Sequence, residues 1–212
     1  MRNESCDEIL YVLESGHDQA ISRKGAKQQR NTIFLNGWPF EITSRTGIYV
    51  RPGQTFTVEN PGPEPLVLIS SQCPEPLDSS SEFVASLTSP LSQSPPRSPV
   101  VRLTDRQAQP TGDRWYRVLV DDELGSTQVT QFVGSIPPGR APDHFHNYEE
   151  VLFILRGIGR MWAGDTHAPI AAGSCVYLPK GQVHCVENTG DEELRLLGVF
   201  YPAGSPSVRY EV

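Results

Sequence analysis

An internal repeat constrains the fold of this 212-residue chain more than any other feature of its sequence. Shifted by 128 positions, the segment GIYVRPGQTFTVENPGPEPLVLISSQCP, which begins at Gly47, overlays CVYLPKGQVHCVENTGDEELRLLGVFYP without a gap. Upstream, and shifted by 142 positions, DEILYVL from Asp7 overlays EEVLFIL from Glu149. A repeat of this length predicts two copies of one fold in tandem.

Short apolar runs with alternating polarity, bounded by Gly, Pro or Asn, recur along the chain and are typical of β-strands. Representative runs are EILYVL, PLVLIS, RWYRVLV, EVLFIL and LRLLGVFYP. No segment has a sustained helical period, and the 18 Gly and 19 Pro residues favour many short elements joined by tight turns. We therefore expect an all-β chain that contains two β-barrels.

The repeat predicts three parts. We expect a first barrel at residues 1–76, a Ser/Pro-rich linker at 77–112 and a second barrel at 113–212. Two predicted strands precede Glu150 in the second copy, but only seven residues precede the matching Glu8. Either Met1 is not the natural start, or the open edge of the first barrel is covered, for example by a partner chain. Because EILYVL and EVLFIL are apolar on both faces, each needs cover outside its barrel, and we expect a homodimer.

Charge and hydropathy exclude several classes of function. The net charge of −7 argues against binding to nucleic acid, which requires clustered Lys and Arg. The longest apolar run, Val151 to Leu155, is far shorter than the roughly 20 residues of a membrane helix. The N-terminus does not resemble a signal peptide, so we expect a cytoplasmic protein. The four cysteines form no C-x-x-C pair, which argues against a structural zinc site.

Four residues have the types and spacing of metal ligands. His144 and His146 are two positions apart, which places both imidazoles on one face of a strand. Glu150 begins the next predicted strand with the same parity, and His184 follows a Pro/Gly turn farther along. Three imidazoles and one carboxylate suit Fe(II), Mn(II), Ni(II), Co(II) or Zn(II). Glu149 is an alternative carboxylate, although its side chain is expected on the opposite face.

The two stretches that hold these residues resemble the conserved motifs of the cupin superfamily, G(X)5HXH(X)3–4E(X)6G and G(X)5PXG(X)2H(X)3N. The second motif matches at every position from Gly173 to Asn188. The first matches from His144 to Gly157, with Gly139 one residue closer to the histidines than the motif requires. This resemblance implies a double-stranded β-helix, or jelly roll, with His144, His146, Glu150 and His184 as ligands of one divalent metal per chain. The tandem arrangement is similar to a bicupin.

The first copy is predicted to lack this site. Under the repeat alignment, His144 and His146 fall on Arg2 and Glu4, and His184 falls on Phe56. Only Glu8 has the same residue type as the predicted ligand that it matches, Glu150. We therefore expect the first barrel to serve structure or assembly, with a small-ligand pocket there as the alternative.

The cupin resemblance implies several reactions on small oxygenated molecules. We favour an O₂-using dioxygenase, with a redox-neutral isomerase or decarboxylase, or a non-catalytic small-molecule-binding cupin, as alternatives. The residues expected around the metal, as pocket or packing groups, are Gln131, Tyr148, Arg160, Trp162, Tyr177 and Gln182. The expected partners are a small-molecule substrate and a second copy of the chain, without nucleic acid or membrane.

Overall fold

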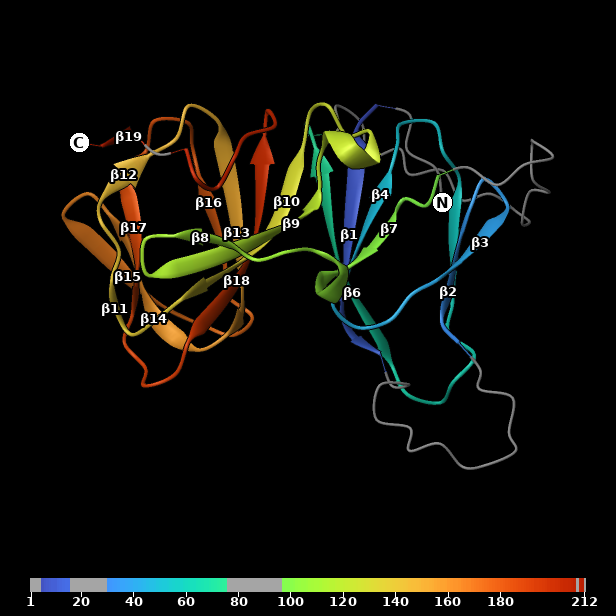
Figure 1. Cartoon of the computed structure of the whole chain (residues 1–212), viewed down its shortest axis with the longest axis horizontal. Coiled ribbons are helices and arrows are strands. Elements are labelled where there is room, and N and C mark those ends of the chain that lie inside the picture. The colour runs from blue at the N-terminus through green and yellow to red at the C-terminus, as the bar shows by residue number, and fades with distance from the viewer. Residues whose placement is uncertain (1–4, 16–29, 76–96, 209, 212) are drawn as a thin grey trace. The chain divides into compact units, whose positions relative to one another are not determined.

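The computed structural model describes residues 5–15, 30–75, 97–208 and 210–211, which form β-strands and two short 3-10 turns (Figure 1). The chain divides into two compact units. The first extends to Asp105 and includes residues 122–126, and the second comprises residues 106–121 and 127–212. The two 3-10 turns are η2 (Leu103–Asp105) and η3 (Asp122–Leu124). No helix in the described ranges has the length and hydropathy of a membrane span. The all-β class expected from the sequence is confirmed.

The first unit contains two antiparallel sheets. In spatial order, the four-stranded sheet comprises β6 (Leu66–Cys73), β1 (Asp7–Ser15), β4 (Thr46–Val50) and β7 (Val100–Arg102). The three-stranded sheet comprises β3 (Trp38–Glu41), β2 (Thr32–Leu35) and β5 (Phe56–Glu59). Alternate residues of these strands, including Leu10, Val12, Ile33 and Ile48, form a buried apolar core.

The second unit is a larger jelly roll of two six-stranded antiparallel sheets (Figure 1). One sheet comprises β16 (Cys175–Leu178), β13 (Glu149–Arg156), β18 (Leu194–Tyr201), β10 (Thr130–Ile136), β9 (Arg114–Val120) and β8 (Gln109–Thr111). The other comprises β15 (Thr166–Ala171), β14 (Ile158–Ala163), β17 (His184–Asn188), β12 (His144–Phe145) and β19 (Tyr210–Glu211), with β11 (Gly139–Arg140) also paired to β17.

Apolar side chains from both sheets fill the interior of the second unit. Leu152 and Ile154 of β13 meet Met161 of β14 and Val186 of β17 in one buried cluster. On β13 and β14 the buried residues alternate with partly or fully exposed ones, as the period-two pattern predicts for a sheet that buries one face. Glu150 has the same parity as Leu152, so its side chain also points inward.

The strand pairing of the two units follows the sequence repeat. Glu8 lies opposite Val50 in the β1–β4 pair, and Glu150 lies opposite Leu178 in the β13–β16 pair. The paired residues of the two units are therefore separated by 142 and 128 positions, the same shifts that align the sequence repeat. The register shift between Val12 and Glu14 on β1 recurs between Ile154 and Arg156 on β13. The tandem jelly rolls expected from the repeat are thus present in the fold.

The range expected as a linker, residues 77–112, contains more strand than its composition suggests. Residues 77–96 lie outside the described residues. Beyond them, β7 pairs with β4 in the first unit and β8 pairs with β9 in the second. Both pairings involve short three-residue strands, which carry too few alternating apolar residues to be recognised from sequence.

Candidate metal centre

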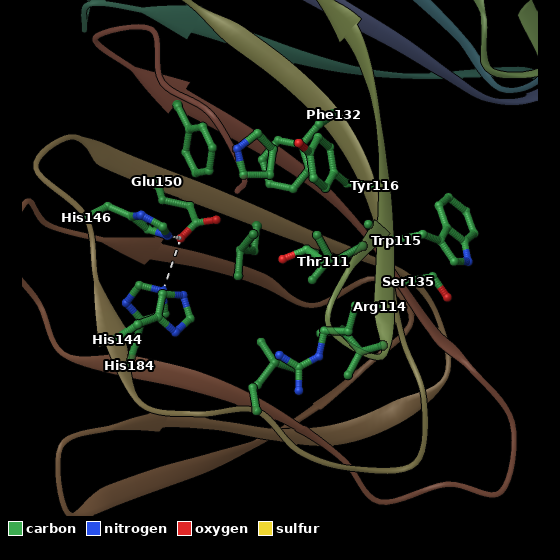
Figure 2. A pocket seen from close by; sticks show the side chains of 18 residues that line it. Thr111, Arg114, Trp115, Tyr116, Phe132, Ser135, His144, His146, Glu150 and His184 are labelled. Atoms are coloured by element: carbon green, nitrogen blue, oxygen red, sulfur yellow. Dashed lines mark ion pairs between the residues drawn. The ribbon is translucent and has the colours of Figure 1, made fainter. Parts of the chain in front are cut away.

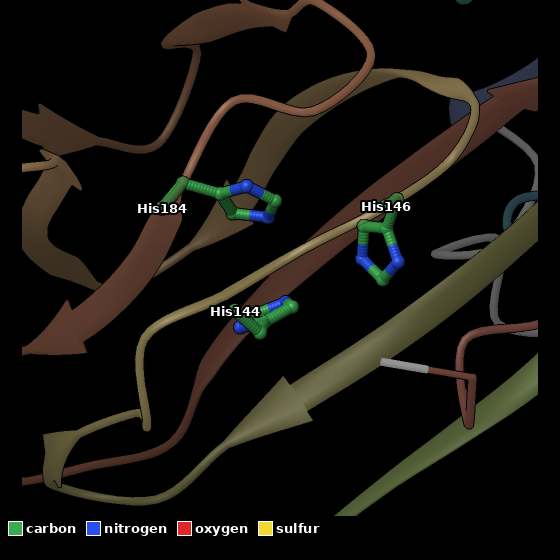
Figure 3. Close-up of side chains that lie close together, drawn as sticks. All are labelled: His144, His146 and His184. Atoms are coloured by element: carbon green, nitrogen blue, oxygen red, sulfur yellow. The ribbon is translucent and has the colours of Figure 1, made fainter. Parts of the chain in front are cut away.

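The three motif histidines converge in the second unit. His144 on β12 and His184, the first residue of β17, are directly opposite each other in register. His146 follows β12 in the turn that leads to β13. One ring nitrogen from each of the three side chains lies within 4.8 Å of the others, and Figure 3 shows the imidazoles grouped together. Residues separated by up to 40 positions therefore meet because β12 and β17 are neighbours in one sheet.

Glu150 completes this group from the opposite sheet. Its Oε2 lies 3.2 Å from Nε2 of His184 and 3.8 Å from Nε2 of His146 (Figure 2, which shows the side chains together). The carboxylate is only 5% exposed. Glu149, the alternative ligand, is exposed on the other face of β13. Strand parity thus places Glu150, and not Glu149, beside the histidines.

Backbone hydrogen bonds orient two of the imidazoles. Nδ1 of His144 lies 2.9 Å from the carbonyl oxygen of Pro142, and Nδ1 of His184 lies 2.8 Å from that of Gln182. A carbonyl oxygen only accepts, so each Nδ1 carries the proton and donates. In the neutral ring, Nε2 is then left with its lone pair, and for His184 this atom faces Glu150. Metal-binding histidines have this arrangement, so the donor set fits a divalent transition metal.

The electrostatics of the site favour a proton on His184 when no metal competes. Burial acts to lower the pKa of His184, but the hydrogen bond to Glu150 and the negative charge of Glu150 outweigh it, so the pKa is raised above its usual value. A metal must displace this proton in order to bind Nε2. Affinity for metal should therefore fall as the pH falls.

The two sequence motifs are also joined through the backbone. The amide of Gly181 donates to the carbonyl of His146 at 2.9 Å. Gly181 has φ +80°, a left-handed conformation that glycine adopts without steric cost. Farther along the second motif, Nδ2 of the Asn188 side chain donates to the carbonyl oxygens of Ile136 and Glu192. The motif glycine and asparagine therefore help to fix the turn that carries His146 and the strand that carries His184.

Tyr148 supports His146 from the side. The two rings stack with centroids 4.9 Å apart and planes 12° apart, and the tyrosine ring also packs on Phe200. The hydroxyl of Tyr148 donates to the carbonyl of Ser205 at 2.8 Å. Burial, followed by the charge of Glu150, raises the pKa of Tyr148, so this hydroxyl keeps its proton. Tyr148 therefore helps to hold the imidazole of His146 in place.

The four donors open into a cavity of about 100 Å³ inside the barrel. This volume is several times the roughly 10–15 Å³ that one water molecule requires, so it has room for a small organic ligand. The wall is mostly apolar and contains a few polar groups. Its members other than the four donors are Thr111, Arg114, Trp115, Tyr116, Phe132, Gly134, Ser135, Ile136, Ala141, Leu152, Val186, Leu196, Phe200 and Pro206.

The remaining residues expected around the metal have different positions. Gln182 contributes its backbone carbonyl, which orients His184. Gln131 belongs to β10 but does not line the cavity, whereas its neighbour Phe132 does. Tyr177 is 58% exposed. Strand parity explains the positions of Gln131 and Tyr177, because it turns both side chains to the face opposite the cavity.

Arg160 and Trp162 also point away from the cavity. Both side chains interact with Glu187, Arg160 through an ion pair at 3.3 Å and Trp162 through a 2.9 Å hydrogen bond from Nε1. Met161, which lies between them on β14, is the residue that enters the core. Conversely, sequence reasoning missed the cavity residues of β8 and β9, above all Arg114 and Tyr116. The alternation in RWYRVLV was the available signal, since it places these two residues on one face.

Comparison with known proteins agrees with the geometry. Residues 132–200 match the family model described as Cupin domain. The chain is 34% identical over 83 residues to Auxin-binding protein 1 of Arabidopsis thaliana, covering 34% of this chain and 42% of that protein. It is 31% identical over 87 residues to an uncharacterized protein of Aquifex aeolicus, covering 40% of this chain and 70% of that protein.

Solved structures extend the likeness in fold to nearly the whole chain. A deletion mutant of Bacillus subtilis oxalate decarboxylase OxdC superimposes with a TM-score of 0.69 at 16% identity. The superposition covers 94% of this chain and 64% of that one. The chain thus spans less than half of the auxin-binding relative and just under two thirds of the decarboxylase. From its motifs, its jelly-roll topology and these matches, we conclude that the chain belongs to the cupin superfamily.

Proposed function

We propose that His144, His146, Glu150 and His184 hold one divalent transition metal, and that the chain is a metal-dependent cupin enzyme for a small oxygenated organic molecule. The observation that carries this proposal is the convergence of three imidazoles and a buried carboxylate at one end of an apolar cavity. A buried carboxylate beside three imidazoles is costly to maintain for packing alone. It is the donor set expected of a site for Fe(II), Mn(II), Ni(II), Co(II) or Zn(II).

We favour O₂-dependent oxidation as the reaction. A divalent metal held by these four residues would supply Lewis-acid activation of a substrate oxygen and of O₂. The protein residues would hold the substrate in one orientation. The apolar walls, including Phe132, Leu152 and Leu196, would exclude bulk water and so strengthen the electrostatic interactions inside.

A second candidate is redox-neutral chemistry or simple binding of a small molecule at the same metal. The similarity over 83 residues to a protein named for binding, Auxin-binding protein 1, favours this candidate. The two candidates share the ligand set and differ in oxygen consumption. An assay for oxygen therefore separates them.

The first unit is, in this proposal, a degenerate cupin barrel, so that the chain is a bicupin with one working site. In support, Phe56 stands where His184 would be and packs against the apolar core of its unit. The counterparts of His144 and His146, Arg2 and Glu4, lie outside the described residues. A homodimer and a cytoplasmic location complete the proposal, to be tested by light scattering and by cell fractionation.

Metal analysis and oxygen consumption test the proposed function. Protein purified without chelators should contain one equivalent of a transition metal per chain, and His146→Ala should contain much less. The metal-loaded protein should then consume oxygen with at least one member of a panel of diketones, catechols and flavonols. His167→Ala is a suitable control, because His167 is an exposed residue of β15. Two equivalents of metal would contradict the degenerate first barrel, and absence of metal would contradict the whole proposal.

A further inference from the structure

Arg140 connects the two chain segments that carry His144 and His184. Its Nε donates to Sγ of Cys185 at 3.2 Å, and its Nη2 donates to the two carboxylate oxygens of Asp143 at 3.0 and 3.2 Å. Asp143 immediately precedes His144, and Cys185 immediately follows His184. One guanidinium therefore contacts the neighbour in sequence of each of these two histidines.

We propose that Arg140 is a positioning residue of the metal centre, which fixes the spacing between the imidazoles of His144 and His184 by bridging Asp143 and Cys185. The inference rests on the proposed function, because it assigns Arg140 a role toward the metal that these histidines would hold. Arg140 is not one of the four donors and does not line the cavity. It also occupies an unspecified position of the first cupin motif, so the motif does not predict this role.

The bridge lies on the outer face of the sheet, and the histidines lie on the inner face. His144 and His184 are paired in register between β12 and β17, and their ring centroids are 4.5 Å apart (Figure 3). Adjacent residues of an extended chain point to opposite faces, so Asp143 and Cys185 point away from the cavity. Contacts with the guanidinium can therefore hold the two imidazoles at one spacing without entering the cavity.

The backbone pairing around His144 is short, which gives a side-chain bridge something to add. β12 has two residues, and in the described strands the pair His144–His184 is the one that joins it to β17. The preceding pairing, between β11 and β17, ends at Arg140. Residues 141–143 between these pairings form no strand. The bridge ties the last of them, Asp143, to β17 directly before the ligand.

The guanidinium is itself supported by Trp162. Its Cζ lies 4.2 Å from the centroid of the Trp162 ring, a distance at which the face of an indole attracts a cation. The indole Nε1 donates to Glu187 at 2.9 Å, and the ring of His167 packs against the indole with centroids 4.3 Å apart. Arg140 therefore presents its donors from a fixed position, as a bridge between two segments requires.

The chemistry of a guanidinium also suits this role. Its planar fork donates through Nε and Nη in fixed directions, so it can join two acceptors at a set separation. A lysine ammonium in the same place would keep the positive charge beside Asp143, but it is a single point without the fork. Comparison of the two side chains therefore separates bridging from charge.

Binding of Co(II) to the full chain, stripped of metal, tests the proposal. Arg140→Gln should weaken Co(II) binding about 10-fold, the lower end of the range for residues that support metal ligands, because Arg140 acts through a neighbour of each ligand. The visible absorption spectrum of bound Co(II), which depends on ligand geometry, should change as well. Arg140→Lys should have an affinity between those of Arg140→Gln and the wild type.

Arg160→Gln is the matched control. Arg160 lies on the same outer face and pairs with Glu187 at 3.3 Å, and none of its described interactions involves Asp143 or Cys185. Its replacement should leave Co(II) affinity within twofold of the wild type and the spectrum unchanged. The melting temperature of each metal-free variant shows separately whether the fold has been damaged.

Asp143→Asn removes the other partner of the charged contact at a side chain that is 46% exposed. It should weaken Co(II) binding in the same direction as Arg140→Gln, and it decides the question if Arg140→Gln does not fold. The double variant should bind Co(II) within twofold of Arg140→Gln, because both changes remove one shared contact.

Three results would overturn the inference. One is a Co(II) affinity within twofold of the wild type, with an unchanged spectrum, in Arg140→Gln or, if that variant does not fold, in Asp143→Asn. Another is an equal loss in Arg160→Gln, which would assign the effect to the outer face in general. The third is a double variant whose loss is the product of the two single losses, because Arg140 and Asp143 would then act independently.

A measurement on the metal-free protein keeps this inference apart from the proposed function. Failure of the wild type to take up Co(II) would refute the metal site. NMR relaxation of the histidine ring carbons then tests the bridge alone, since Arg140→Gln should broaden the signals of His144 and His184, whereas Arg160→Gln should leave them unchanged. Unchanged signals of both histidines in Arg140→Gln would refute the bridge whether or not metal binds.

Discussion

The two units have matching strand registers, but the buried carboxylate in each has a different neighbour. Glu8 and Glu150 occupy matching positions on β1 and β13, and they are 3% and 5% exposed. Oε1 of Glu8 accepts a 2.8 Å hydrogen bond from the hydroxyl of Ser70. Glu150 instead faces the imidazole of His184. The same strand framework thus accommodates a buried acid with either a hydroxyl or an imidazole as neighbour, so the fold does not by itself determine the chemistry.

A second pair of matching positions separates packing from coordination. Phe56 begins β5 opposite Leu35, and His184 begins β17 opposite Ala163. Phe56 packs against the apolar core of the first unit, whereas His184 belongs to the polar cluster of the second. One substitution at this position therefore exchanges a core contact for a candidate ligand.

The largest effect, on metal affinity, is expected when His184 of the second unit is replaced by phenylalanine, the residue at the matching position of the first unit. His184→Phe should lower metal affinity more than 100-fold. Loss of a residue that only hydrogen-bonds a metal ligand already lowers affinity roughly 10- to 100-fold, and loss of a ligand itself should cost more. The melting temperature of the metal-free protein should change little, because phenylalanine is accommodated at the equivalent position. Competition with a chelator and calorimetry provide the two measurements. Unchanged affinity would show that His184 is not a ligand.

The next effect compares the two cores at one matched position. Ile154 and Val12 are fully buried and lie 142 residues apart. Ile154→Ala should lower the free energy of unfolding by about 2–5 kcal/mol, and Val12→Ala by about 1–3 kcal/mol because a smaller cavity remains. Urea denaturation measures both. Val67→Ala, at an exposed site on β6, should change stability by less than about 0.5 kcal/mol. Comparable losses at Val67 and Val12 would contradict the observed core.

A smaller effect is expected at Tyr148, whose counterpart in the first copy is Cys6. Tyr148→Phe keeps the stack on His146 and loses the bond to Ser205, so stability should fall by about 0.5–1.5 kcal/mol with nearly unchanged metal affinity. Tyr148→Cys copies the first unit, loses the stack and should weaken metal binding several-fold. Equal metal affinity in the two variants would show that the stack does not position His146.

The smallest effect is a pH dependence confined to the second unit. Because the folded-state pKa of His184 is raised, its contribution to stability is fully present below the unfolded pKa of about 6.5 and is lost as the pH rises through the folded pKa. Metal-free wild type should therefore lose stability relative to His184→Phe as the pH rises from 6 through neutrality. Chemical denaturation across this range measures the difference. A difference that grows with pH would reverse the sign and refute the ion pair with Glu150.

Much of the candidate site could be predicted because its residues are specified locally. The spacing of His144 and His146, the parity of Glu150 and the Pro/Gly turn before His184 all depend on residues close in sequence. Arg160 and Trp162 could not be excluded in this way, because their direction depends on Met161 being the residue of β14 that enters the core. Arg114 was missed for a related reason. Its hairpin reaches the cavity only when β9 pairs with β10, a contact between separate segments.

Long-range pairing also limited prediction of the fold. Short β7 and β8 lie within the range that composition assigned to a linker, and each is a strand because of the partner it meets. The final strand, β19, pairs with β12 beside His144. The ring of Tyr210 stacks on the ring of Phe145, with centroids 5.4 Å apart. Nothing in two residues of sequence indicates such a partner.

The carbonyl groups that orient His144 and His184 belong to residues only two positions earlier, Pro142 and Gln182. Each imidazole is therefore oriented in part by a carbonyl group of its own three-residue segment. Because this contact is local, a histidine with its two preceding residues is a natural unit for grafting into another jelly roll.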